Sequence, residues 1–167
     1  MTRKALLYRE GDWLLVPLAS GGHGLGRAAR IDGEGAILGY FFGPRLSRPP
    51  DFAFLEQLRP QDAVMIKRFG DLGIQRGDWG VIDGSDNWRA ENWPIPAFRQ
   101  ESLLDHRCWR VTYTADNLLI FSERVERPCE EVRHLNEDGL SGSEALAVAL
   151  DRKVDPTPSG PARPPER

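Results

Sequence analysis

The chain has 167 residues, of which 40% are hydrophobic and 28% charged, values that are ordinary for a soluble globular protein. This length is sufficient to bury a core without disulfides or metals, so we expect one domain over residues 1–154. The formal net charge of -3 argues against a nucleic-acid binder that depends on a dominant phosphate-neutralising surface. No apolar segment is long enough for a signal peptide or a membrane span, so we expect a cytoplasmic protein without a membrane partner.

The first part of the chain predicts a β-hairpin. Residues 11–18 are apolar, with β-branched and aromatic side chains, and a Ser20-Gly21-Gly22 turn separates them from a second strand over residues 24–31. Residues 36–42 predict the next strand. Because this run is apolar almost throughout, we expect both of its faces to be buried.

Residues 24–29 also match the G-x-G-x-x-G/A pattern of dinucleotide-binding proteins. That pattern binds a pyrophosphate only where a helix begins at the glycines, and Gly33 and Gly35 leave no room for such a helix. We therefore predict that Gly24 and Gly26 allow close packing within the hairpin, and we expect no cofactor.

The middle of the chain predicts a short helix over residues 52–58 and strands over 63–69 and 78–82, joined by a connector over 70–77. The tripeptide Gly-Asp-Trp opens strands twice, at residues 11–13 and 77–79. In each copy the glycine permits a turn, the aspartate can accept N–H bonds of that turn, and the tryptophan can cover a core edge.

The last part of the chain predicts a hairpin with arms over residues 107–114 and 118–122, then a helix over 143–150 that Ser141 or Ser143 caps. Residues 155–167 are rich in proline and are predicted to be a disordered tail. The fold class is therefore α+β and β-rich. We expect a strongly bent antiparallel sheet or a small, partly open β-barrel of roughly six to eight strands, with one C-terminal helix.

No pattern in the sequence indicates a catalytic or metal site. Cys108 and Cys129 belong to no C-x-x-C pair, and in a cytoplasmic protein we predict buried or incidental thiols. The three histidines, His23, His106 and His134, do not have metal-ligand spacing. An enzyme remains an alternative only if the fold assembles a site around His106 or His23, and we assign no catalytic residue.

Two segments are candidates for binding a protein partner. Trp88 and Trp93 lie in a polar, proline-bearing segment, whereas Trp13, Trp79 and Trp109 are expected in the core. Trp88 and Trp93 have two interpretations. Together with Asp83, Asp86 and Glu91 they form an anionic aromatic patch suited to a basic protein, or they lie in a loop whose rings cover one end of a sheet.

Residues 115–151 are the second candidate segment. They carry nine acidic and three basic side chains. This excess of acidic residues indicates either a docking face for a basic partner or simply a solvated surface.

Several short glycine-led motifs follow one another in a characteristic order. They are Gly11-Asp12, Val16-Pro17-Leu18, the Gly-x-Gly-Arg-Ala of residues 24–28, the run from Gly77 to Gly84, and Trp93-Pro94-Ile95-Pro96 before Phe98. Over residues 8–152 this order resembles the immunity protein 26 family of bacterial polymorphic toxin systems. The resemblance implies a small cytoplasmic antitoxin that binds and neutralises a cognate toxin domain encoded by a neighbouring gene, without catalysis and without a cofactor.

A different functional class is a small β-barrel that binds nucleic acid or regulates another protein. Such a module needs a basic stripe, although the composition makes nucleic acid an unlikely partner. The stripe would consist of Arg27, Arg30, Arg45, Arg48, Lys67 and Arg68.

Overall fold

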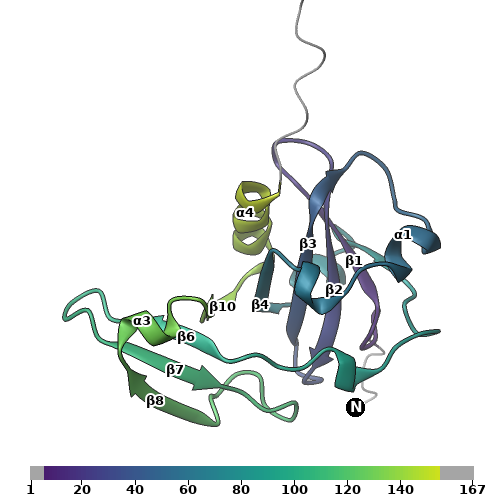
Figure 1. Ribbon diagram of the computed structural model, residues 1–167. Coiled ribbons are helices and arrows are strands. Elements are labelled where there is room, and N and C mark those ends of the chain that lie inside the picture. The colour runs from purple at the N-terminus through teal and green to yellow at the C-terminus, as the bar shows by residue number, and fades with distance from the viewer. Residues whose placement is uncertain (1–5, 155–167) are drawn as a thin grey trace, which may run out of the picture.

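The computed structural model describes residues 6–154, which form two β-sheets and several short helices (Figure 1). The larger sheet has the strand order β10 (Leu140–Ser141), β4 (Met65–Gly70), β3 (Ala36–Leu46), β2 (His23–Ile31), β1 (Trp13–Pro17) and β5 (Gly80–Ile82). The smaller sheet has the order β8 (Glu123–Arg127), β7 (Cys108–Thr112), β6 (Phe98–Glu101) and β9 (Asn136–Glu137). The helices are α1 (Phe52–Glu56), α2 (Leu72–Gln75), α3 (Cys129–Val132) and α4 (Ser143–Lys153), with 3-10 turns η1 (Pro60–Asp62) and η2 (Ala90–Asn92).

The β-rich α+β class is confirmed, but the predicted antiparallel sheet or barrel is wrong in two respects. Each sheet contains one parallel pair, β10 with β4 and β6 with β9, so both sheets are mixed. In the described part of the chain, neither sheet closes into a barrel. The strands that add these parallel pairs, β9 and β10, are only two residues long. A strand that short leaves no periodic pattern in the sequence.

The predicted N-terminal hairpin is confirmed, with Trp13 opposite Arg27 and Pro17 opposite His23. Strand β3 pairs with β2, and residues 36–42 are all buried, as their apolar sequence predicts. The glycines of β2 have the predicted packing role: a Cβ at Gly24 would lie 2.3 Å from Leu150 Cδ2, and one at Gly26 would lie 2.6 Å from the Phe41 ring. Both glycines lie within β2, whereas the dinucleotide-binding pattern has its glycines at the start of a helix.

Side chains alternate between the two faces of the larger sheet along its strands, and an apolar cluster covers each face. Ile37 and Phe41 pack on one face with Leu146 and Leu150 of α4. The opposite face carries a second apolar cluster that includes Leu55 of α1 and residues of the smaller sheet. Figure 1 shows the smaller sheet extending away from α1. Phe52, Ala53 and Glu56 of α1 are exposed to solvent.

Several predicted elements agree with the structure. The helix over 52–58 is α1, the strands over 63–69 and 78–82 are β4 and β5, and the C-terminal helix is α4. The connector over 70–77 contains the short helix α2. The predicted capping by Ser141 or Ser143 is wrong, since the N-cap is Gly142 and the hydroxyl of Ser143 instead accepts a bond from the Gly73 N–H.

The second arm of the predicted late hairpin is also wrong. Strand β7 pairs with β8, while residues 118–122 lie in the loop between them. The side chain of Asn117 accepts bonds from the N–H groups of Leu119 and Ile120, at 3.0 and 3.1 Å, and so turns the chain there. The predicted tail over 155–167 lies outside the described residues. Within residues 6–154, no helix combines the length and apolarity that crossing a membrane requires.

The prediction that the two cysteines are buried or incidental thiols is wrong, because Cys108 and Cys129 form a disulfide. The two cysteines are 21 residues apart in sequence, but the fold brings β7 and α3 together with a Cα–Cα distance of 5.1 Å. Sequence spacing alone does not reveal this contact, because it depends on how α3 packs on the smaller sheet.

Candidate functional site

A groove of about 620 Å³ lies between α1 with η1 on one side and residues 83–92 on the other. Trp13 of β1, Arg27 of β2 and Trp93 contribute to its lining, and all three are buried. Phe52 at the start of α1 also lines it and is 65% exposed. The groove thus combines a fixed aromatic and cationic floor with an apolar side chain that is accessible to a partner.

The guanidinium of Arg27 is enclosed by indole rings. Its Cζ lies 4.4 Å from the ring centroid of Trp13 and 4.8 Å from those of Trp88 and Trp93. Nε donates to the carbonyl of Gly11 at 2.9 Å, and Nη2 donates to that of Gly84 at 3.1 Å. Burial lowers the pKa of Arg27 to about 10, an effect that the nearby Asp12 carboxylate opposes. Cation–π contacts and two carbonyl bonds therefore compensate the buried charge and fix the floor.

Local backbone geometry explains why these segments meet. Gly11 has a φ of +95°, and a Cβ there would lie 2.6 Å from the Trp88 ring. A Cβ at Gly84 would lie 2.1 Å from the Gly11 carbonyl oxygen. Asp12 accepts bonds from the N–H groups of Arg9 and Gly84, at 2.8 and 3.2 Å. The roles predicted for the first Gly-Asp-Trp are confirmed, and Gly77 in the second copy likewise has a positive φ, of 77°.

The structure places the sequence-predicted partner residues at or beside this groove. Asp83 and Asp86 are exposed and line it, whereas Glu91 is exposed outside the lining. Trp93 is only 5% exposed, and the ring centroid of the half-buried Trp88 lies 6.1 Å from that of Trp93. The segment therefore folds back with its rings toward the sheet, and Trp93 shapes the floor of the groove.

The rim of the groove is predominantly anionic. Exposed Glu56, Asp83 and Asp86 face one exposed cation, Arg59. Bonds from the Ser85 hydroxyl and N–H lower the pKa of Asp83, with a further contribution from Arg9, whose Nη2 lies 3.6 Å from its carboxylate. Asp83 is thus ionised at neutral pH.

The site residues predicted from the sequence did not include Arg27 of the floor, or Phe52 and Glu56 on α1. A signal existed for α1, since Phe52 and Leu55 are spaced to lie on one side of a helix. Nothing in the sequence indicates that this helix faces residues 83–92. That neighbourhood arises only once β1, β2 and β5 pair.

The other predicted acidic surface, residues 115–151, is distributed over β8, α3, β9, β10 and α4. Three of its nine carboxylates are paired with arginines outside the segment. The pairs are Asp138 with Arg68 at 3.1 Å, Asp151 with Arg45 at 2.7 Å, and Glu126 with Arg107 at 2.5 Å. These pairs reduce the negative charge that the segment offers to a partner.

The predicted basic stripe is largely engaged in internal contacts. Arg27 is enclosed by indoles, Arg45 and Arg68 form the ion pairs above, and Arg30 donates to the carbonyls of Ala90 and Trp93, each at 3.1 Å. Of the remaining members, Arg48 is exposed and Lys67 is half-buried. The fold therefore does not align these six cations along one open face.

The histidines of the enzyme alternative come from separate parts of the fold. His23 belongs to β2 of the larger sheet, while His106 lies exposed in the loop between β6 and β7. His134 is exposed after α3. Over residues 6–154, the one cluster of three potential metal ligands is Glu101, Cys108 and Cys129, which contains no histidine.

The family pattern described as Immunity protein 26 matches residues 9–109. The chain belongs to the Immunity protein 26 family. Members of this family are immunity proteins of polymorphic toxin systems, and every residue that lines the groove lies inside the matched range. No curated protein and no solved structure matches the chain.

Proposed function

We propose that this chain protects its producer by binding a cognate toxin domain, encoded by a neighbouring gene, and blocking it through non-catalytic contact in the cytoplasm. Membership of the Immunity protein 26 family supports the general role. The observation that carries the finer proposal is the groove between α1 and residues 83–92, because it joins a rigid floor to an exposed aromatic side chain and an acidic rim. An inhibitor needs this combination of a stable scaffold and a complementary surface.

The chemistry of the groove favours a basic segment of the toxin as its ligand. Asp83, Asp86 and the adjacent Glu91 attract lysine or arginine side chains and accelerate association with a positively charged partner. Phe52 supplies an apolar contact at the edge. Trp88 and Trp93 contribute indirectly by holding Arg27 and the floor in place, so their side chains shape the contact surface from beneath.

A neutralisation assay tests the function. The product of the adjacent gene is expressed in cells with and without this chain, and survival is followed together with co-purification of the two proteins. We expect death without the chain, and rescue with a stable complex when it is present. A harmless neighbour, or equal killing in both cultures, would contradict the proposal for that pair.

Charge reversal tests the surface. The first variant combines Asp83→Lys, Asp86→Lys and Glu91→Lys. The second, a control, combines Glu130→Lys, Glu131→Lys and Glu137→Lys and so changes three exposed carboxylates of the 115–151 segment. We expect the first variant to weaken toxin affinity by about 10- to 100-fold, mainly through slower association, and the second to leave affinity near wild type. Circular dichroism and urea titration establish that both variants are folded. The opposite ranking would assign the contact to the 115–151 segment.

A further inference from the structure

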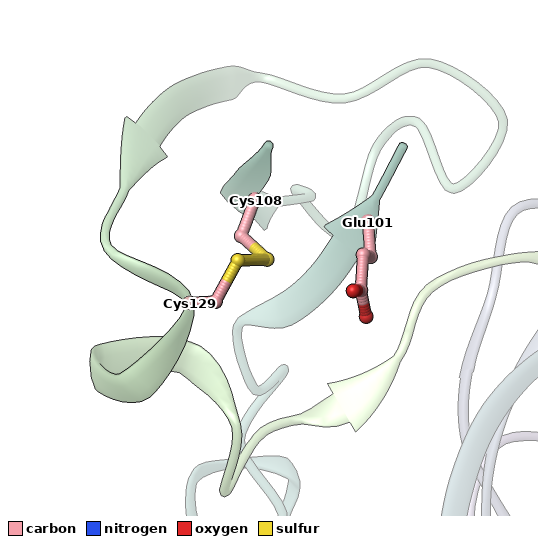
Figure 2. A group of neighbouring side chains, drawn as sticks. All are labelled: Glu101, Cys108 and Cys129. Carbon is pink, nitrogen blue, oxygen red and sulfur yellow. A yellow bond between two sulfur atoms is a disulfide. The ribbon is translucent and has the colours of Figure 1, made fainter. Parts of the chain in front are cut away.

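A group of potential metal ligands lies where β6 ends and β7 begins in the smaller sheet, away from the groove (Figure 2). Glu101 of β6 and Cys108 of β7 are directly opposite each other in the antiparallel pair, and Cys129 is the first residue of α3. One carboxylate oxygen of Glu101 and the two Sγ atoms all lie within 4.8 Å of one another. In Figure 2 the Glu101 side chain lies beside the disulfide.

The frame that positions these three groups does not depend on the disulfide alone. Strand pairing fixes Glu101 against Cys108. Helix α3 packs on β6 and β7, and its Val132 is only 2% exposed. Just after the helix, the Leu135 carbonyl accepts a bond from Arg99 Nε at 3.0 Å. Cys129 therefore stays close to the other two ligands when the sulfur–sulfur bond is absent.

We propose that reduction of Cys108–Cys129 creates a binding site for Zn²⁺, with the two thiolates and the Glu101 carboxylate as ligands. A dithiol reductant of the thioredoxin class transfers two electrons and two protons to the disulfide, which becomes two thiols while the reductant becomes a disulfide. Zn²⁺ then displaces the two thiol protons to solvent and bonds to both sulfurs. Two thiolates and a carboxylate are common zinc ligands, and water completes a four-coordinate shell.

The charges around the cluster support this assignment. Two thiolates and one carboxylate carry three negative charges, so bound Zn²⁺ leaves a single negative charge. Arg99 and Arg133 line the same cavity of about 110 Å³, together with Gln100 and Val132, so two cationic residues border the negatively charged site. Nearby cations also favour the thiolate over the thiol, which is the form that binds metal.

The proposed cytoplasmic action gives this chemistry a setting, since cytoplasmic reductants keep protein thiols reduced. Disulfide and zinc site are mutually exclusive because both use the same two sulfurs. The chain would therefore carry either a covalent link or a metal link between β7 and α3. The zinc inference does not depend on where the toxin binds, so the two proposals can fail separately.

Metal binding by the full chain tests the site. The chain is reduced with a phosphine, which is then removed without air, and Zn²⁺ alone is added before native mass spectrometry and competition with a chromophoric chelator. We expect one Zn²⁺ per reduced chain and none per oxidised chain. Co²⁺ in place of Zn²⁺ is expected to give sulfur-to-cobalt charge-transfer absorption and the visible bands of a tetrahedral ion.

Matched variants identify the third ligand. Glu101→Gln is expected to weaken Zn²⁺ binding by at least about tenfold, whereas Glu137→Gln, an exposed carboxylate on the neighbouring strand β9, leaves it unchanged. Equal binding by the oxidised chain, no binding by the reduced chain, or wild-type affinity in Glu101→Gln would overturn the proposal. A reduced chain that unfolds, as judged by circular dichroism, and does not refold with Zn²⁺ would overturn it as well.

Discussion

The groove floor depends on backbone contacts that leave no space for a side chain. Gly84 approaches the Gly11 carbonyl, whose oxygen also accepts the Arg27 Nε–H bond. The Gly84 carbonyl accepts the second Arg27 bond. A single methyl group at Gly84 therefore disturbs the position of Arg27 and of the Asp83 rim together.

Gly84→Ala is expected to lower the free energy of unfolding by about 1–3 kcal/mol, because the Cβ would lie 2.1 Å from the Gly11 oxygen and the segment must move. Gly70→Ala is the matched control, since nothing lies within 4 Å of a Cβ at Gly70. Urea titrations of both variants measure the difference. Similar urea midpoints for the two variants would show that the segment at Gly84 moves to accommodate the methyl group without losing stability.

Buried tyrosines make stability sensitive to alkaline pH. Burial raises the pKa of Tyr40 to about 12, although Arg30 acts in the opposite direction, and the hydroxyl donates to the Pro94 carbonyl. Between pH 10 and 12 the unfolded chain loses this proton while the folded chain keeps it. The stabilisation is therefore complete below pH 10 and is lost as the pH rises toward 12.

Tyr40→Phe isolates that effect. We expect the wild type to be more stable than the variant at pH 8 by about 1 kcal/mol, because the variant leaves the Pro94 carbonyl without this donor. As the pH rises from 10 to 12, the wild type should lose about 2 kcal/mol relative to the variant, so the difference in stability changes sign before pH 12. Urea titrations at a series of pH values give the comparison, and a pH-independent difference would contradict the raised pKa.

At the scale of elements, a buried polar cluster joins the two sheets. Arg68 of β4 pairs with Asp138 at 3.1 Å, and Asp138 also accepts bonds from the Tyr113 hydroxyl at 2.9 Å and from Gln100 Nε2 at 2.7 Å. The Arg68 guanidinium lies 3.8 Å from the Tyr113 ring centroid, and Arg68 Nη1 donates to the Leu118 carbonyl at 2.6 Å. The smaller sheet is thus docked by an ion pair and several hydrogen bonds as well as by apolar packing, although Arg68 Nε is buried without a hydrogen-bond partner among residues 6–154.

Asp138→Ala is expected to destabilise the fold by about 3–5 kcal/mol, because it leaves Arg68 buried without its counter-charge. Glu126→Ala removes the partner of Arg107 from an exposed ion pair and should destabilise the fold far less, because solvent screens that pair. Urea unfolding followed by tryptophan fluorescence and by circular dichroism compares the two. Equal effects from the two variants would mean that this cluster does not hold the sheets together.

The elements that sequence reasoning predicted well are those with a strong local signal. The hairpin over residues 11–31 and the strand over 36–42 are long, apolar and bounded by glycine turns. Strand β8 reads Glu-Arg-Val-Glu-Arg and carries almost no apolar signal, while β9 and β10 exist only through pairing with distant strands. Asp83 and Asp86 were found because they cluster in sequence, whereas Arg27 and Phe52 join them only through tertiary structure.

At the scale of the whole molecule, the family match ends before the fold does. The match stops at residue 109, within β7, and most of the smaller sheet and all of α4 follow it. Leu146 and Leu150 of α4 are fully buried against the larger sheet, and Leu150 lies against Gly24 of β2. The groove residues therefore belong to the matched part, but their scaffold requires the remainder of the chain.

This requirement predicts how shortened chains behave. A chain that ends at residue 109 loses the α4 side chains that cover one face of the larger sheet, and each buried leucine alone is worth about 2–5 kcal/mol. That loss approaches the stability of a whole domain, so we expect no cooperative urea transition. A chain that ends at residue 154 keeps both apolar clusters and should unfold with the midpoint of the full chain. A cooperative transition in the shorter chain would instead make the matched region a domain in its own right, and the groove could then be studied without α4.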